Sequence, residues 1–292
     1  MRIVFIGTVE FSQRVLTRLI EVGADVVGVC TLAASPFAAD HVDLSPLCRQ
    51  HDIPSHYADD INSAASIAWI AEKAPDVIFC FGWSRLLKDE LLQLAPLGVV
   101  GFHPAALPAN RGRHPLIWAL VLGLEQTAST FFFMDAGADS GDILSQSTVT
   151  IAPTDDARAL YDKVTATALA QIEAFVPRLA DGSAGRMPQD RTLANVWRKR
   201  GRSDGQIDWR MSAATIHNLV RGLSRPYVGA HFVVDNADVK VWRSAVIDAP
   251  ANIEAGKVLG TRDGCIVVKC GTGALCLLET EPPFARPTGV YL

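Results

Sequence analysis

Short apolar runs alternate with helical patterns along roughly the first hundred residues of this chain. β-Branched and aromatic residues fill the runs at residues 2–6, 25–31, 76–81 and 98–102. Between them, apolar residues recur at helical spacing and predict helices at residues 11–20, 44–51, 63–73 and 88–94. Strands that alternate with helices predict a parallel sheet covered by helices on both faces. We therefore expect a Rossmann-like α/β domain whose ligand crevice lies beyond the carboxyl ends of the strands.

The remaining sequence completes this domain and then changes in character. A helix is expected at 115–122, strands at 128–134 and 142–151, and a long helix at 154–179. Residues 182–205 are polar and basic, which is typical of a linker. Beyond them we expect one helix at 213–223 and short strands at 231–234, 239–243, 256–261, 265–270 and 274–279, the pattern of a small β-barrel or open barrel. The predicted organisation is an α/β domain at 1–182, a linker at 183–205 and a small OB-like domain at 206–292.

The composition of the 292 residues favours a soluble globular protein of the cytoplasm. Hydrophobic residues make up 49% and charged residues 20%, and neither a signal peptide nor a membrane-spanning run is expected. The six cysteines form no CxxC pair, which predicts buried free thiols in a reducing compartment. A net charge of −4 argues against a broad nucleic-acid-binding surface. The seven histidines do not pair with cysteines or carboxylates at ligand spacing, so no metal site is predicted.

The first strand is followed by Gly7-Thr8, without the further glycines of a GxGxxG fingerprint. The glycine is explained by a strand-to-helix turn, and the sequence gives little support to an NAD site. The sheet pattern alone therefore does not indicate a dehydrogenase.

The stretch from Val99 to Asp142 carries the residues that most suggest chemistry. The strand at 98–102 delivers His103 to its carboxyl end, and prolines and glycines stiffen the loop that follows. Asp139 lies in the turn G-A-D-S-G-D, where glycines permit a tight turn. A histidine and a carboxylate brought together on loops are suited to proton transfer near neutral pH. Each also has a structural interpretation, His103 as a buried core histidine and Asp139 as a turn or cap residue.

Two arginines flank Gly112 in the same loop. Arg111 and Arg113 could bind an anionic ligand group through charge-assisted hydrogen bonds, or they could be solvated loop residues. The basic cluster R-K-R-G-R at 198–202 also has two interpretations, a solvated linker or a phosphate contact at the domain junction.

These motifs together resemble the formyltransferase family that uses 10-formyltetrahydrofolate. That family has a strand ending in Asn-x-His, a loop of the type S-L-L-P-x-x-R-G and an Asp in an x-D-x-G turn. The counterparts here are Gly101-Phe102-His103, Ala105–Gly112 and Ala138–Gly141. The resemblance covers nearly the whole chain, from F-I-G-T-V-E-F near the start to I-D-W-R-M-S at 207–212. The segments R-G-R-H-P-L-I-W-A-L and R-P-Y-V-G-A-H-F are most similar to the branch that formylates amino sugars on nucleotide carriers.

The resemblance implies an enzyme that moves the formyl group of 10-formyltetrahydrofolate to the primary amine of a nucleotide-linked amino sugar in surface polysaccharide (lipopolysaccharide) biosynthesis. It implies no metal and no membrane partner, and it leaves a homodimer open. Trp83 is expected to be a packing residue. The residues that the resemblance assigns are catalytic His103 and Asp139; folate-binding Arg85, Leu86, Leu87, Arg113, Asp135, Ala136, Gly137 and Ala138; and acceptor-binding Arg111, Asn110, His114 and Tyr227.

Gly101 departs from the family pattern, which has Asn at this position. In the family, that amide is thought to donate a hydrogen bond to the formyl oxygen, and loss of one such donor costs about 3–4 kcal/mol. Asn110 and His114 are the candidates to replace it. Two alternatives to sugar formylation stay open: a methionyl-tRNA formyltransferase, and a folate- or nucleotide-binding homologue whose activity is reduced by the loss of this Asn.

Overall fold

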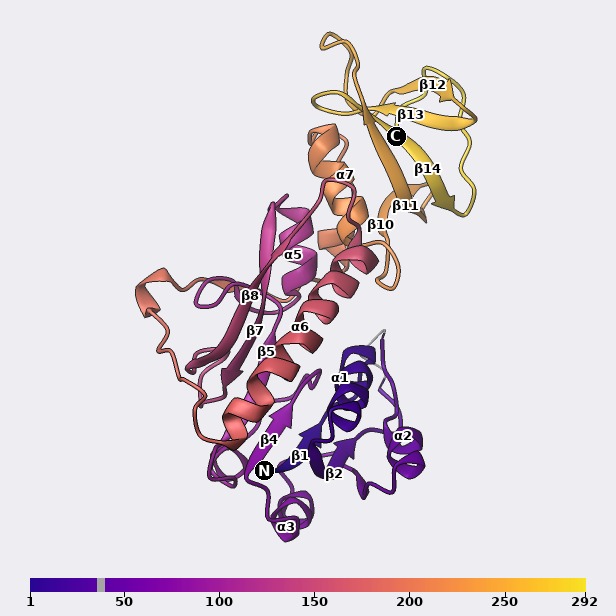
Figure 1. Cartoon of the computed structure of the whole chain (residues 1–292). Coiled ribbons are helices and arrows are strands. Elements are labelled where there is room, and N and C mark those ends of the chain that lie inside the picture. Colours follow the sequence, from indigo (N-terminus) through magenta and orange to yellow (C-terminus); the bar gives the residue numbers. More distant parts are fainter. Residues whose placement is uncertain (36–39) are drawn as a thin grey trace. The chain divides into compact units, whose positions relative to one another are not determined.

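The chain divides into two compact units, each assembled from stretches that are distant in the sequence (Figure 1). The computed structural model describes residues 1–35 and 40–292. Unit 1 comprises Met1–Gly112, Thr127–Val149 and Asp162–Trp197, and unit 2 comprises Arg113–Gln126, Thr150–Tyr161 and Arg198–Leu292. The three-part division with a linker at 183–205 stays a prediction.

Unit 1 is built on a seven-stranded sheet with the order β3-β2-β1-β4-β5-β7-β8 (Figure 1). The strands are β1 (Arg2–Ile6), β2 (Asp25–Thr31), β3 (Ser55–Tyr57), β4 (Val77–Cys80), β5 (Val99–His103), β7 (Gln126–Phe133) and β8 (Ile143–Thr150). All pairs among β1 to β5 are parallel, which confirms the predicted Rossmann-like arrangement for this part of the sheet. The strand order reverses between β1 and β4, the point beyond which ligands bind in such sheets.

The other side of this sheet differs from the all-parallel prediction. β7 runs antiparallel to β5, with Val100 opposite Phe133 and His103 opposite Thr130. The end of β7 therefore lies beside the start of β5, where Met134 N–H donates a hydrogen bond to the carbonyl of Val99 at 2.7 Å. The chain that follows β7 has to return along the sheet to reach the carboxyl end of β5.

Side chains alternate along the strands and pack against helices on both faces, as predicted. On one face, Phe79 contacts Phe175 of α6 (Ala157–Ala180), with ring centroids 6.1 Å apart. On the other face, Ile6 lies in a buried cluster with Ile70 of α3 (Ala64–Glu72). The remaining helices near this sheet are α1 (Glu10–Glu21), α2 (Ser45–Gln50) and α4 (Asp89–Leu92).

Residues 182–197, which the sequence assigned to a linker, are hydrogen-bonded to the rest of unit 1. Met187 and Ile143 exchange backbone hydrogen bonds of 2.9 and 2.8 Å. Further along, a short 3₁₀ turn (Arg191–Leu193) is followed by β9 (Val196–Trp197), which pairs in parallel with β6 (Arg111–Gly112). These bonds attach residues 187–197 to other parts of unit 1.

Unit 2 contains an antiparallel five-stranded sheet with the order β10-β11-β14-β13-β12. The strands are β10 (Ala230–Val234), β11 (Ala237–Ile247), β12 (Val258–Arg262), β13 (Cys265–Lys269) and β14 (Ala274–Glu281). Its core also receives Ile117 from α5 (Pro115–Val121) and Ile216 from α7 (Ala213–Gly222). The strands confirm the predicted small β domain, and α5 joins its core although it lies between β5 and β7 in the sequence.

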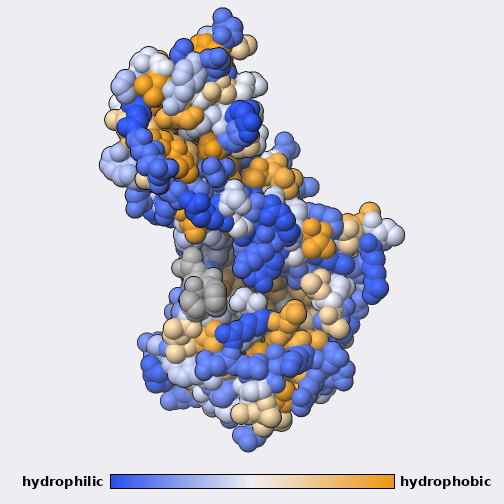
Figure 2. Space-filling model, turned by 180° about the vertical axis from the view of Figure 1, so that it is seen from behind, coloured by the Kyte–Doolittle hydropathy of each residue, from blue (hydrophilic) through white to orange (hydrophobic). Residues whose placement is uncertain are grey.

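None of the helices in the described residues is both long and apolar enough to cross a membrane. The face of the molecule in Figure 2 is mainly hydrophilic, with groups of hydrophobic residues between. All six cysteines are free and all but Cys265 are buried, as the absence of CxxC pairs predicted. Burial raises the pKa of Cys30 and of Cys80 to about 12, so these thiols are protonated and unreactive at neutral pH.

Candidate active site

His103 is buried at the end of β5, and each of its ring nitrogens faces an oxygen atom. Nε2 lies 2.8 Å from the carbonyl oxygen of Asn110, and Nδ1 lies 3.6 Å from Oδ2 of Asp139. Because a carbonyl oxygen can only accept, Nε2 must carry a proton, and in the neutral ring Nδ1 is then the basic nitrogen. The structure thus brings together the two residues that were predicted to be catalytic.

The backbone of residues 110–112 holds both partners of His103. Asn110, whose carbonyl faces Nε2, is left-handed with φ at +64°. Gly112 N–H donates a hydrogen bond to Oδ2 of Asp139 at 2.9 Å. Gly112 also has a positive φ, +104°, and a Cβ on it would lie 2.3 Å from the carbonyl oxygen of Trp197 in β9. Only glycine fits there, so the contact with β9 is part of how this loop is positioned.

Asp139 reaches His103 from a turn that starts at the opposite end of β5. The turn follows β7, and within it Oδ1 of Asp135 accepts hydrogen bonds from Gly137 N–H at 2.9 Å and from the Ser140 hydroxyl at 2.6 Å. Asp139 itself is left-handed, with φ at +53°. Left-handed non-glycine residues cost free energy and are frequent at functional sites, where the surrounding structure maintains them.

The His103–Asp139 pair can hold and release a proton. When Nδ1 is protonated, the imidazolium has an acceptor for each of its N–H groups, the Asn110 carbonyl and the Asp139 carboxylate. This arrangement suits a general base that stabilises its own charged form. Among residues 1–35 and 40–292, no group of three or more His, Cys, Asp or Glu side chains is arranged to hold a metal ion.

Gly101 lies on the same face of β5 as His103, because the two are two residues apart in a strand. A Cβ at this position would lie 2.9 Å from Cγ of Met134 and 3.0 Å from Cζ of Phe132. These two side chains occupy the space that an Asn at position 101 would need. The departure from the family pattern is therefore built into the local packing.

The residues predicted to bind folate are only partly brought together. Leu87 is buried in the core cluster beneath β1 and β4, whereas Arg85 and Leu86 are exposed. Asn62 holds their loop, because its side chain donates to the carbonyl of Leu86 at 2.9 Å and accepts from Lys88 N–H at 2.7 Å. The other residues predicted to bind folate are exposed. Asp135, Ala136, Gly137 and Ala138 lie in the turn before Asp139, and Arg113 belongs to unit 2. Their folate contacts stay predictions.

Of the residues predicted to bind the acceptor, Asn110 and Arg111 lie in the loop beside His103. Arg111 donates a hydrogen bond from Nη2 to Oε1 of Gln189 at 2.6 Å, and its Nε is buried without a partner in the described residues. His114 and Tyr227 belong to unit 2, where Tyr227 is half-buried against the hydrophobic core. The acceptor contacts of all four residues stay predictions.

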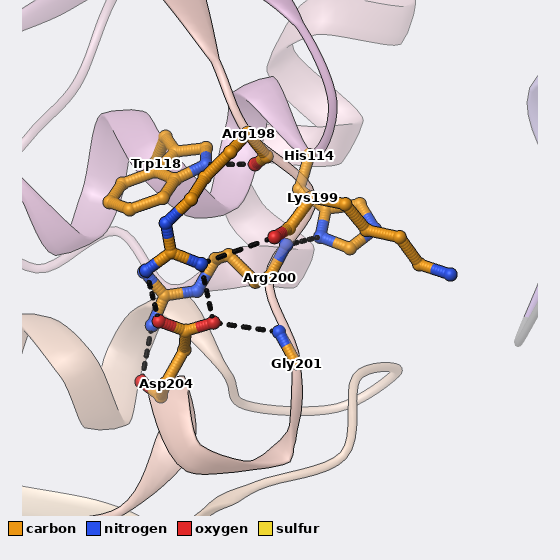
Figure 3. A network of polar contacts seen from close by, with 7 residues as sticks. All are labelled: His114, Trp118, Arg198, Lys199, Arg200, Gly201 and Asp204. Atoms are coloured by element: carbon orange, nitrogen blue, oxygen red, sulfur yellow. Dashed lines mark hydrogen bonds and ion pairs between the residues drawn. The ribbon is translucent and has the colours of Figure 1, made fainter.

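His114 belongs to a polar network of unit 2 that Figure 3 shows at close range. Its Nδ1 accepts a hydrogen bond from Arg200 N–H at 3.3 Å. Trp118 donates from Nε1 to the carbonyl of Arg198 at 3.0 Å, and the guanidinium of Arg200 lies 4.6 Å from the centroid of a Trp118 ring. The basic cluster at 198–202 is therefore built into unit 2 rather than simply solvated.

Asp204 is the anion at the centre of this network (Figure 3). It accepts hydrogen bonds from Nη1 of Arg198 at 2.8 Å and from Gly201 N–H at 2.7 Å, and these bonds lower its pKa. The pKa of His114 is also lowered, first by burial and then by the neighbouring cations Arg113, Lys199 and Arg200. His114 is therefore neutral at pH 7.

Two side chains beyond the ends of β1 and β4 were missed by the sequence reasoning. His41 pairs with the hydroxyl of Thr8 through Nδ1 at 2.8 Å, while its Nε2 is buried without a partner in the described residues. Trp83, expected to be only a packing residue, likewise leaves its Nε1 buried and unpaired. Buried polar atoms are almost always hydrogen-bonded, so each of these nitrogens is available to a water molecule or a ligand. The only sequence signal that could have identified His41 and Trp83 is that each follows a predicted parallel strand.

Comparison with known proteins identifies the same family in both parts of the chain. The family model described as Formyl transferase matches residues 1–174, and the model described as Formyl transferase, C-terminal domain, matches residues 200–288. The methionyl-tRNA formyltransferase of Geobacter metallireducens is 32% identical over 285 residues, which cover 96% of this chain and 91% of that relative.

Solved structures share the fold across nearly the whole chain. The sugar 3N-formyl transferase WlaRD, solved in the presence of dTDP and 5-N-formyl-THF, has a TM-score of 0.73 at 14% identity, with 97% of this chain and 99% of that chain covered. The N-formyltransferase from Helicobacter canadensis, solved with folinic acid and dTDP-3-aminofucose, has a TM-score of 0.71 at 14% identity, with 95% and 98% covered. At this level of identity the likeness shows the fold alone.

Proposed function

The chain belongs to the formyl transferase family, and from that membership we propose that it transfers the formyl group of 10-formyltetrahydrofolate to a primary amine. The observation that carries the proposal is the buried imidazole of His103, with one nitrogen 2.8 Å from the Asn110 carbonyl and the other 3.6 Å from the Asp139 carboxylate. An amine that attacks a formyl carbon must lose a proton, and this pair is suited to receive it.

The residues around the carboxyl ends of β1, β4 and β5 fit a folate cosubstrate. Buried nitrogens of His41 and Trp83 lack partners in the described residues, and a pterin offers both donors and acceptors for such groups. We assign these two side chains, with the loop at Arg85–Leu87, to folate binding. Bound 10-formyltetrahydrofolate would supply the formyl group that the amine attacks.

In the proposed mechanism, His103 takes a proton at Nδ1 from the attacking amine. The Asp139 carboxylate and the Asn110 carbonyl then hold the imidazolium between them, because each accepts one of its N–H groups. The same proton returns to the folate nitrogen as the bond between that nitrogen and the formyl carbon breaks. His103 therefore ends the reaction neutral.

We assign the hydrogen bond to the formyl oxygen, which the family Asn would donate, to the side-chain amide of Asn110. That amide has no hydrogen-bond partner among the described residues, because only the backbone N–H and carbonyl of Asn110 are engaged. The other candidate, His114, accepts a hydrogen bond from Arg200 through Nδ1 and belongs to unit 2. Asn110 is also the residue that contacts His103 directly.

We propose a nucleotide-linked amino sugar as the acceptor. The segments R-G-R-H-P-L-I-W-A-L and R-P-Y-V-G-A-H-F resemble the branch of the family that formylates nucleotide-linked amino sugars. A net charge of −4 is also unfavourable for binding a tRNA, whose phosphates demand a cationic surface. This assignment would place the protein in surface polysaccharide biosynthesis.

A second candidate acceptor is methionyl-tRNA, because the relatives at 32–33% identity over nearly the whole chain are methionyl-tRNA formyltransferases. The third candidate, a folate- or nucleotide-binding homologue of reduced activity, is favoured by Gly101 and by the packing that fills the place of the missing Asn.

One assay separates the three candidates. The purified protein is incubated with 10-formyltetrahydrofolate and, in parallel, with dTDP-, UDP- and GDP-linked amino sugars and with initiator methionyl-tRNA, and formylated products are measured by mass spectrometry. We expect one sugar nucleotide to be formylated with a kcat/KM at least about a hundredfold above that for the tRNA. The His103→Ala variant is the control for enzyme-dependent transfer.

Formylation of methionyl-tRNA alone would refute the sugar assignment and keep formyl transfer. Binding of folate by calorimetry without turnover of any amine would refute formyl transfer and support the third candidate.

A further inference from the structure

Two amides in the segment 187–197 hold the two pieces of backbone that face His103, the loop at residues 110–111 and the turn at residues 139–141. We propose that Gln189 and Asn195 are positioning residues for the formyl transfer proposed above: Gln189 fixes the turn whose carboxylate faces Nδ1 of His103, and Asn195 fixes the loop whose carbonyl puts the proton on Nε2. The inference rests on that proposed function for its kinetic consequence, and on the geometry of unit 1 for the placement itself.

Gln189 connects the turn of Asp139 to Arg111. Its Nε2 donates to the carbonyl of Asp139 at 3.0 Å and to the carbonyl of Gly141 at 2.6 Å. Its Oε1 accepts from Nη2 of Arg111 at 2.6 Å. Only an amide matches this set, because one end must donate to two carbonyls while the other must accept from a guanidinium.

Asn195 holds the loop whose carbonyl meets His103. Its Oδ1 accepts from Asn110 N–H at 2.7 Å, and its backbone carbonyl accepts from Arg111 N–H at 3.1 Å. Here the side chain acts only as an acceptor, since no partner of its Nδ2 exists among the described residues. The bond helps to hold Asn110 in its left-handed conformation.

The segment that carries both amides is itself anchored at each end. Arg186 donates to the carbonyl of Leu97 at 2.8 Å, and its guanidinium lies 3.6 Å from the ring centroid of Phe133. At the other end, β9 pairs with β6. The amides are thus presented by a fixed piece of unit 1.

The consequence for His103 follows from its two contacts. The Asn110 carbonyl puts a proton on Nε2, and the Asp139 carboxylate faces Nδ1. If the loop shifts, Nε2 loses its acceptor and the neutral ring can protonate Nδ1 toward Asp139 instead. In that tautomer the nitrogen beside Asp139 no longer accepts a proton from the amine.

The test uses the same chemical change, amide to carboxylate, at both positions. We expect Gln189→Glu to lower kcat by about 10- to 100-fold, because a carboxylate cannot donate to the carbonyls of Asp139 and Gly141. We expect Asn195→Asp to retain wild-type kcat, because the carboxylate still accepts from Asn110 N–H. We expect Asn195→Ala to lose kcat to about the same extent as Gln189→Glu. Asp190→Asn is the matched control, since the Asp190 side chain bonds to the neighbouring Thr192 and to no other side chain in the described residues.

A second readout is independent of turnover. The ¹⁵N shifts of the His103 ring, assigned by comparison with His103→Gln, report the tautomer directly. We expect the Nε2-protonated form in the wild type, in Asn195→Asp and in Gln189→Glu, which leaves the bonds of Asn110 in place, and a mixture of tautomers in Asn195→Ala. This measurement tests the positioning even if no acceptor is formylated.

The proposal is overturned if Gln189→Glu matches Asp190→Asn in kcat, or if Asn195→Asp is as slow as Asn195→Ala. It is also overturned if the tautomer of His103 is unchanged in every folded variant. If Gln189→Glu fails to fold, as judged by circular dichroism, the comparison of Asn195→Asp with Asn195→Ala tests the proposal, because Asn195 is exposed. If the wild type transfers no formyl group but the His103 tautomers are as expected, the proposed function is refuted and the positioning role of the two amides still holds.

Discussion

His103 in unit 1 and His114 in unit 2 lie close together in the sequence, yet the atoms that face their ring nitrogens are of opposite kinds. His103 has an oxygen acceptor beside each nitrogen, the carbonyl of Asn110 and the carboxylate of Asp139. The Nδ1 of His114 is instead an acceptor for Arg200 N–H, and burial together with neighbouring cations lowers its pKa. The first site can accommodate a proton, and the second disfavours one.

This difference shows that residue type and loop position do not decide what a histidine does. Both side chains lie in the motif G-F-H-P-A-A-L-P-A-N-R-G-R-H-P, and both were predicted to be site residues. What separates them is the segment of chain that packs on each. Residues 187–197 hold the loop and the turn that contact His103, whereas Arg200 of the basic cluster donates a hydrogen bond to His114 (Figure 3).

The largest effect should come from removing His103, the proposed proton acceptor. We expect His103→Ala to lower kcat/KM for formyl transfer by about 10²–10⁴-fold, because the amine then has no positioned base. His114→Asn should change kcat by less than about threefold, since Asn tolerates the left-handed backbone and can accept from Arg200 N–H. Steady-state kinetics on the identified acceptor, with folding checked by circular dichroism, provide the measurement.

The comparison breaks if the two variants lose similar activity. Near-normal turnover by His103→Ala, and likewise by Asp139→Ala, would remove this pair from the mechanism altogether.

A smaller effect is expected from restoring the family residue at position 101. Gly101→Asn should destabilise the protein by about 1–3 kcal/mol, because its side chain has to displace Met134 and Phe132. The free energy of unfolding in urea measures this, and the double variant Gly101→Asn with Met134→Ala should recover part of the loss. An unchanged stability in the single variant would show that the space beside His103 is open, contrary to the packing observed.

The smallest effect concerns pH. Because the pKa of His114 lies below its ordinary value of 6.5 in the folded chain, the unfolded chain binds a proton more readily. This group therefore does not lower stability above about pH 6.5, and stability falls as the pH decreases from that value through the lower folded-state pKa. His217 and His231 of unit 2 also have pKa values lowered mainly by burial and should act in the same direction.

This sign is tested by urea unfolding at pH 8 and at pH 5.5. The wild type should lose more stability between the two conditions than His114→Asn, which has no titrating group at this position. Equal losses would mean that His114 is solvated and carries no such coupling.

The elements of unit 1 were largely predictable, because each depends on a local pattern. The apolar runs 2–6, 76–81 and 98–102 appear as β1, β4 and β5 within one or two residues, and the helix expected at 63–73 begins after the Ser63 cap. The direction of β7 was not predictable, because the pairing of two strands leaves no local signal in either of them. The turn of Asp139 therefore begins beside the start of β5, whereas an all-parallel sheet would have placed it at the carboxyl end of β5.

The site was predicted in its parts but not in its assembly. His103 and Asp139 were found through their motifs, and the structure places them 3.6 Å apart. Gln189 and Asn195 were overlooked because they lie in a polar stretch whose composition resembles that of a linker. Their hydrogen bonds to residues 110–141 are long-range contacts, which composition cannot show.

The sequence by itself determined the order of strands and helices, the family and the two residues of the proposed catalytic pair, since these depend on periodicity and on short motifs. The tertiary structure alone decided that β7 reverses, that Met134 and Phe132 fill the space beside Gly101, and that His103 rather than His114 is surrounded by acceptors. The physical reason is that the protonation of a buried imidazole depends on which charges and dipoles lie within a few ångströms of it, and those come from segments far away in the chain.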